Sequence, residues 1–163
     1  MMMNLVTVAP TATTYASTKN ARYSSNKSNI RTIKQRWDET YNSHPNKFLI
    51  DYTLESAKSE FKRRYPNLVR WEDLPLAEAK DAILIDVKID GTMQRQLNIF
   101  WVLELLTKFL ATAVVPIQVY RPNPDKDEYL AWDGQHTLVL LWLIATQIFE
   151  VDPSSVRIPV NVY

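Results

Sequence analysis

The segment from residue 138 to residue 145, Leu-Val-Leu-Leu-Trp-Leu-Ile-Ala, is apolar on every side of a helix. Such a helix has no polar face to turn toward water, so it lies either in a protein core or in a membrane. A helix of about a dozen residues is too short to cross hydrocarbon, which takes roughly 20. The sequence therefore predicts a buried core helix and no membrane association.

Just before this helix lies Gly134, one of only two glycines in the chain. It belongs to the segment Trp-Asp-Gly-Gln-His-Thr at residues 132–137, between an apolar extended run and the apolar helix. A strand that turns abruptly through Asp133 and Gly134 into a helix leaves the first helical N–H groups free, which is the geometry of an anion site. Gly91 follows another apolar extended run, so both glycines are expected at strand ends.

Composition limits the architecture and the chemistry. A chain of 163 residues with 46% hydrophobic content closes one core rather than two. The formal net charge of +1 gives no global field that would indicate nucleic acid or membrane by itself. The absence of cysteine excludes disulfides, thiolate nucleophiles and cysteine metal sites. We expect an intracellular, cytoplasmic protein.

The first 37 residues carry only basic charges. Residues 1–29 are rich in Ser, Thr and Asn and are expected to form a flexible basic arm. The arm either neutralises phosphates of a nucleic acid or is a solvated tail; a transit peptide is less favoured because the segment lacks an amphipathic apolar face. The basic residues up to Trp37 are Lys19, Arg22, Lys27, Arg31, Lys34 and Arg36.

Residues 30–82 are expected to form a helical extension. Large apolar residues recur at helical spacing over residues 30–43 and again over residues 54–65, with Pro66 ending the second helix. A short helix is predicted over residues 76–82.

Beyond residue 82 the pattern alternates between extended and helical segments, which predicts an α/β or α+β core over residues 83–163; of the two we expect the α+β class. Strands are expected at 83–87, 114–120, 128–132 and 156–162. Helices are expected at 97–111 and after Gly134. The polar turn at residues 123–127 would join the second and third of these strands as a hairpin.

The order of these segments resembles the core of the ParB/sulfiredoxin superfamily. The resemblance rests on Met-Gln-Arg at 93–95, Val-Pro-Ile-Gln-Val at 115–119, Tyr-Leu-Ala-Trp-Asp-Gly-Gln-His at 129–136 and Ile-Pro-Val at 158–160. It covers about half of the chain. It implies a small mixed sheet with packed helices, here preceded by the N-terminal helical extension, and a phosphate loop of the Asp-Gly-Gln-His-Arg type.

This resemblance also implies a set of site residues. The implied phosphate or nucleotide ligands are Gln94, Arg95, Gly134, Gln135, His136 and Thr137. Thr137 stands where the family usually has arginine, so a charged bidentate donor is replaced by a neutral hydroxyl. Gln135 stands where sulfiredoxin has its cysteine, which excludes sulfinic-acid repair by that route.

Each of these residues also has a structural interpretation. Asp133 is either a catalytic residue and Mg²⁺ ligand or a helix N-cap. His136 is a phosphate donor or an acid/base catalyst if it is functional. Gln94 and Arg95 either contact ligand or join two loops, and Trp132 is expected in the core.

The leading hypothesis is a domain that binds a nucleotide or nucleic-acid phosphate, with a nucleoside triphosphate and Mg²⁺ as implied cofactors. If it is an enzyme, the expected chemistry is metal-assisted phosphodiester hydrolysis, as in a ParB-like nuclease, or phosphoryl transfer. The alternative is a non-catalytic DNA-associated module, from a phage or mobile element, with a degenerate phosphate loop. A third possibility is a protein-interaction domain. Nucleotide or DNA is the expected partner, and the sequence does not determine the oligomeric state.

Overall fold

The computed structural model describes residues 29–76, 80–92 and 94–163. A six-stranded sheet forms one layer, in the order β2-β4-β6-β5-β7-β3. The strands are β2 (Ile30–Arg31), β3 (Lys80–Ile83), β4 (Val87–Asp90), β5 (Ile117–Tyr120), β6 (Tyr129–Ala131) and β7 (Arg157–Val162). Both parallel and antiparallel pairs occur, so the sheet is mixed. The protein has an α+β fold, as the sequence predicted.

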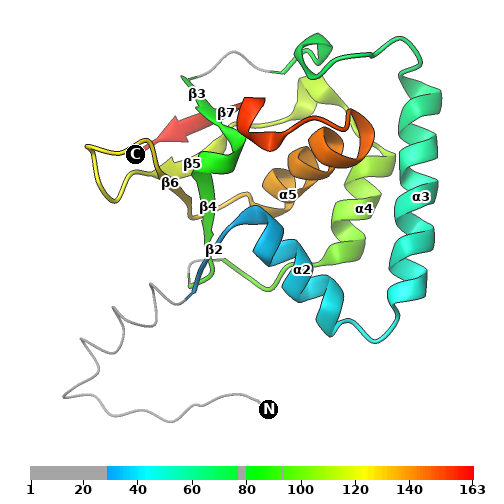
Figure 1. Ribbon diagram of the computed structural model, residues 1–163, viewed down its shortest axis with the longest axis horizontal. Helices are drawn as coiled ribbons and strands as arrows, with labels where there is room; N and C mark the ends of the chain where they lie inside the picture. Colours follow the sequence, from blue (N-terminus) through cyan, green and yellow to red (C-terminus); the bar gives the residue numbers. More distant parts are fainter. Residues whose placement is uncertain (1–28, 77–79, 93) are drawn as a thin grey trace.

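The described residues also form four α-helices. They are α2 (Ile33–Ser43), α3 (Lys47–Arg64), α4 (Ile99–Thr107) and α5 (Gln135–Leu143), the last continued by a π-helical turn, Ile144–Ile148. Figure 1 shows α4 between α5 and the outermost helix, α3, with all the helices on one side of the sheet. Helix α5 is therefore the one enclosed most completely by the other elements.

The pairing of the central strands decides where the candidate site lies. Strands β4 and β6 are parallel, with Ile89 opposite Ala131. The segments that follow them therefore leave the sheet at the same edge, although about 40 residues separate them in the chain. Strands β5 and β6 form the predicted antiparallel hairpin, with Val119 opposite Ala131.

Helix α5 lies in the core, which confirms the prediction from its apolar run. Leu138, Leu141 and Leu143 are completely buried. Within the described part of the chain, no helix combines the length and the apolar character that crossing a bilayer requires. Burial of the helix body fixes its N-terminus at the edge of the sheet.

The prediction of a single strand over residues 83–87 is wrong. Strand β3 ends at Ile83, and Leu84–Asp86 form a 3₁₀ turn before β4 begins at Val87. Leu84 is fully buried and its N–H donates to the carbonyl of Val156 at 2.8 Å, whereas Ile85 is half exposed. A short apolar run is compatible with a strand or with a turn, and the contact with Val156 selects the turn here.

The segment 30–82 contributes both edge strands as well as helices, so it is not purely helical. Residues 30–31, predicted as helix, form β2. Helix α2 begins at Ile33, three residues later than predicted, because Thr32 and Gln35 form a capping box. Part of the short helix predicted over 76–82 is strand β3, because residues 80–83 pair with β7.

The remaining boundaries shift by a few residues. Helix α3 begins at Lys47, earlier than predicted, because the side chain of Asn46 caps it, and it ends at Arg64 before Pro66. Helix α4 spans only part of residues 97–111 because Asn98 is its N-cap. Strand β5 starts after Pro116, which has no N–H to donate. The predicted arm at 1–29 lies outside the described residues except for Asn29, whose carbonyl accepts from the N–H of Gly91 at 3.0 Å.

Candidate phosphate-binding site

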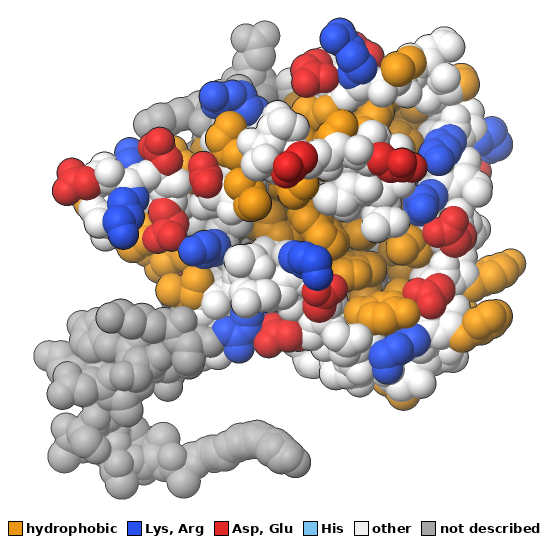
Figure 2. Space-filling view, viewed as in Figure 1, with side chains coloured by type: hydrophobic (Ala, Val, Ile, Leu, Met, Phe, Trp, Pro, Cys, Tyr) orange, Lys and Arg blue, Asp and Glu red, His pale blue; other side chains and the backbone are white. Residues whose placement is uncertain are grey.

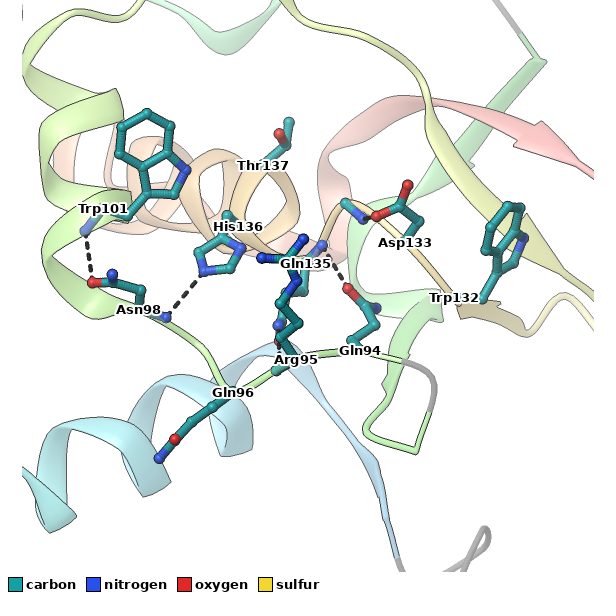
Figure 3. Close-up of a pocket in the computed structure, with 11 residues that line it drawn as sticks. Gln94, Arg95, Gln96, Asn98, Trp101, Trp132, Asp133, Gln135, His136 and Thr137 are labelled. Carbon is teal, nitrogen blue, oxygen red and sulfur yellow. Dashed lines mark hydrogen bonds between the residues drawn. The ribbon is translucent and has the colours of Figure 1, made fainter.

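The segments that follow β4 and β6 meet at the sheet edge and enclose a cavity of about 550 Å³. One wall comes from residues 132–137 and the other from residues 94–101 (Figure 3). Every site residue predicted from the sequence lies here. The lining residues are Gln94, Arg95, Gln96, Asn98, Trp101, Trp132, Asp133, Gly134, Gln135, His136 and Thr137.

Gly134 makes the turn from strand to helix possible. Its φ of 86° lies in the left-handed region, which glycine adopts without strain. It is also the N-cap of α5. The structural interpretation of Asp133 as the N-cap of this helix is wrong. Its Oδ1 accepts the N–H of Gly134 at 2.8 Å, and Gly134 occupies the N-cap position instead.

Gln94 links the two walls of the cavity. Its Nε2 donates to the carbonyl of Ala131 at 2.7 Å, and its Oε1 accepts the backbone N–H of Gln135 at 2.9 Å. Both polar ends of this side chain are therefore occupied by contacts within the protein. This geometry favours the structural interpretation of Gln94, a contact between two loops.

Gln135 is a buried polar residue with a similar structural role. Only 2% of it is exposed. Its Nε2 donates to the carbonyl oxygen of Arg95, and its Oε1 accepts from Nε of Arg36 at 3.0 Å. Arg36 also donates from Nη2 to the same carbonyl at 2.8 Å. Arg36 of helix α2 and Gln135 of helix α5 thus together hold the backbone of the 94–98 segment in place at Arg95.

Two backbone donors remain at the start of α5. The N–H of Gln135 is bonded to Gln94, and the N–H of Leu138 donates to the carbonyl of Gly134 at 3.0 Å. The N–H groups of His136 and Thr137 find no acceptor within the described part of the chain. The partial positive charge of a helix N-terminus resides on such groups.

His136 joins the starts of two helices. Its Nε2 accepts the backbone N–H of Asn98, the N-cap of α4, at 3.0 Å (Figure 3). A nitrogen that accepts carries no proton, so the neutral ring carries its proton on Nδ1. Burial, then the positive charges of Arg36 and Arg95, lower the pKa of His136 below its ordinary value of 6.5. His136 is therefore a neutral hydrogen-bond donor through Nδ1 at neutral pH.

The lowered pKa of His136 predicts how stability depends on pH. Between pH 6.5 and the lower folded-state pKa, the unfolded chain binds more protons than the folded protein. The contribution of His136 is therefore present above pH 6.5 and is lost as the pH falls through the folded-state value. Chemical denaturation across this range should show a shallower decline for His136→Gln than for the wild type. Equal slopes for the variant and the wild type would contradict the assignment.

Arg95 provides the cavity with a permanent positive charge. Its carbonyl is held by Gln135 and Arg36, whereas its guanidinium has no hydrogen bond or ion pair with any residue that the structure describes. The side chain is exposed at the cavity wall. It is therefore available to an anionic ligand, in contrast to Gln94.

Among the described residues that line the cavity, Asp133 is the single carboxylate. Within the described residues, no group of three or more His, Asp or Glu side chains is placed to hold a metal ion. Mg²⁺ in phosphoryl-transfer sites is commonly bound by one or two carboxylates together with substrate phosphates. One carboxylate is thus compatible with Mg²⁺ that arrives with a nucleotide.

Sequence reasoning missed several residues of this site. Arg36 was assigned to the basic N-terminal part, and neither Gln96 nor Asn98 was singled out. Trp132 was expected in the core but lines the cavity and is partly exposed, with its ring 5.7 Å from that of Tyr163. Of these residues, Asn98 could have been found from the sequence, because an Asn directly before an apolar helical run is typical of a helix N-cap.

Comparisons with protein-family models, with curated proteins and with solved structures find no match for this chain.

Proposed function

We propose that this cavity binds a phosphate group of a nucleotide or nucleic acid. The observation that supports this proposal is the convergence of donor groups of different origin. The backbone donors are the two N–H groups at the start of α5 that have no acceptor among the described residues. The two side-chain donors are the guanidinium of Arg95 and the Nδ1–H of His136, so the groups are of three kinds. Oriented backbone N–H groups at a helix N-terminus combined with a cationic side chain form a common phosphate-binding arrangement. The ParB/sulfiredoxin-like order of strands and loops supports the same proposal.

Catalysis at this site would use the same residues. Asp133 would hold Mg²⁺ together with the phosphate oxygens, and the metal would supply charge neutralisation. Nδ1–H of His136 would donate a hydrogen bond to a phosphate oxygen or to the leaving-group oxygen. Because Nε2 already accepts from Asn98 and the ring is neutral, His136 is suited to donating a hydrogen bond in the transition state rather than to transferring a proton. The expected reaction is phosphodiester hydrolysis or phosphoryl transfer.

A non-catalytic DNA-associated module is the second candidate function. Thr137 in place of the usual arginine favours it, because a hydroxyl stabilises transferred charge less than a guanidinium does. The presence of just one carboxylate among the described lining residues favours it as well. In this case the loop would bind phosphate without turnover.

Binding of phosphate should depend on Arg95. We expect Arg95→Ala to weaken nucleotide binding about tenfold, because a hydrogen bond to a charged group contributes about 1.5–3 kcal/mol. The measurement is the thermal shift of purified protein with ATP, CTP, GTP and their diphosphates, with and without Mg²⁺. Arg70→Ala is the matched control, since the side chain of Arg70 is 69% exposed and lines no part of the cavity.

The outcomes of this titration separate the proposals. A shift that is reduced in Arg95→Ala and kept in Arg70→Ala supports a phosphate site in the cavity. Absence of any shift, together with absence of binding to single- or double-stranded DNA, would overturn it. Incubation of the wild type with plasmid and oligonucleotide substrates and Mg²⁺ or Mn²⁺ then distinguishes an enzyme from a binding module, with His136→Ala as the control for contaminating nucleases.

A further inference from the structure

Two tryptophans flank the phosphate-binding donors. Trp101 lies in the first turn of α4 and is 46% exposed, although tryptophan is among the largest apolar side chains. Trp132 follows β6 on the other wall. Figure 3 shows the two indoles at opposite ends of the cavity, with His136 and Arg95 between them. Planar surfaces are thus available on both sides of the place proposed for phosphate.

Two further cavities lie next to this one. Gln96 lines this cavity and two others of about 270 and 470 Å³, so the three adjoin along the 94–98 segment. The second cavity reaches Arg31 of β2 and Arg36 of α2. The third reaches His44 and Phe100, whose rings lie 5.3 Å apart. The three neighbouring cavities, which share Gln96, together present polar groups and aromatic rings, and we call their lined surface the track.

We propose that the ligand of this track is a single-stranded nucleic acid, whose bases stack on Trp101 and Trp132 while the phosphate between them is held at Arg95 and the start of α5. This inference rests on the proposed phosphate-binding function and specifies its ligand. Stacking on aromatic side chains tolerates any base, because every base has a π face. In a duplex these faces are already stacked on their neighbours, so the tryptophans discriminate against double strands.

The charge distribution agrees with a ligand that is bound by stacking. Basic and acidic side chains are interspersed over the face shown in Figure 2 and form no field of a single sign there. Around the track itself, Arg31 pairs with Glu39 at 2.9 Å. A protein that held duplex DNA through its phosphates would need a cluster of cationic side chains. At this site, stacking of bases on the tryptophans would supply the binding free energy that the few cationic side chains do not.

The test is fluorescence anisotropy with a labelled oligothymidylate about ten nucleotides long, a length within the site sizes of single-strand-binding folds. The competitors are dTMP, dTTP and the same oligonucleotide annealed to its complement. We expect the single strand to bind at least about tenfold more tightly than dTMP or the duplex. Trp101→Ala should weaken binding of the oligonucleotide about tenfold, whereas Trp101→Phe, which retains an aromatic face, should restore most of it.

Phe48→Ala is the matched control, because Phe48 is an aromatic residue on α3 with 79% exposure that lines none of these cavities. Equal affinity for dTMP and oligothymidylate, or unchanged binding by Trp101→Ala, would overturn the single-strand inference and leave the phosphate site intact. If the wild-type protein binds none of these nucleotides and oligonucleotides, both the phosphate-binding function and the single-strand inference are overturned. Retained dTMP binding in Trp101→Ala, with weakened oligonucleotide binding, supports both.

Discussion

The variant Gln135→Leu should lower the free energy of unfolding by about 2–3 kcal/mol, although it replaces a buried polar side chain with an apolar one of similar size. Gln135 is 2% exposed and accepts from Nε of Arg36. Leucine cannot accept this bond, so the variant leaves a partly buried charged donor without its partner. Denaturant unfolding of the purified protein measures the change.

A matched variant and a double variant test this explanation. Gln96→Leu, at an exposed glutamine of the same cavity, should change the unfolding free energy by no more than about 0.5 kcal/mol. Combining Gln135→Leu with Arg36→Met removes donor and acceptor together, so the double variant should be less destabilised than the sum of the single changes. Strict additivity would show that the contact between Arg36 and Gln135 contributes nothing.

The two glycines should respond differently to the same pair of substitutions. Gly134→Ala should cost about 1–2 kcal/mol of unfolding free energy, because an alanine is strained in the left-handed region. Space is not the cause, since an added Cβ would lie 3.5 Å from Cδ1 of Ile117, an ordinary contact. Asparagine tolerates this backbone conformation better, so Gly134→Asn should be less destabilising than Gly134→Ala.

At Gly91 the obstacle is a neighbouring backbone atom. An added Cβ would lie 2.7 Å from the carbonyl oxygen of Asn29, and the φ of Gly91 is not in the left-handed region. Gly91→Ala and Gly91→Asn should therefore both destabilise the protein, with no advantage for asparagine. Thermal unfolding of the four variants provides the comparison. An equal loss for Gly134→Ala and Gly134→Asn would show that backbone conformation is not what position 134 requires.

Local patterns were sufficient wherever one segment carried its own signal. The apolar run of α5 predicted a buried helix because no orientation of it could face water. The hairpin of β5 and β6 followed from two extended runs around a polar turn, and Pro66 marked the end of α3 because proline cannot continue a helix. The prediction of a strand over residues 83–87 was wrong because a run of five residues is too short to show a periodicity that distinguishes a strand from a turn.

The site was predictable in part. Both glycines stand at strand ends, and the loop at 132–137 does lie at a strand-to-helix junction. The expectation that residues 94–95 lie opposite this loop also agrees with the structure, which joins them through Gln94 and Gln135. The prediction that the side chains of Gln94 and Gln135 contact the ligand is not favoured by the structure. The polar atoms of both side chains form hydrogen bonds within the protein.

The sequence by itself determined the buried helix, the glycine turn before it and the α+β class, because these depend on the period of apolar residues and on the backbone freedom of one residue. The tertiary structure alone decided which residues share the cavity. Arg36 bonds to Gln135 across 99 positions in the chain, and the parallel pairing of β4 with β6 brings residues 94–98 beside residues 132–137. No local pattern records such a contact, because packing of the whole chain brings the two partners together.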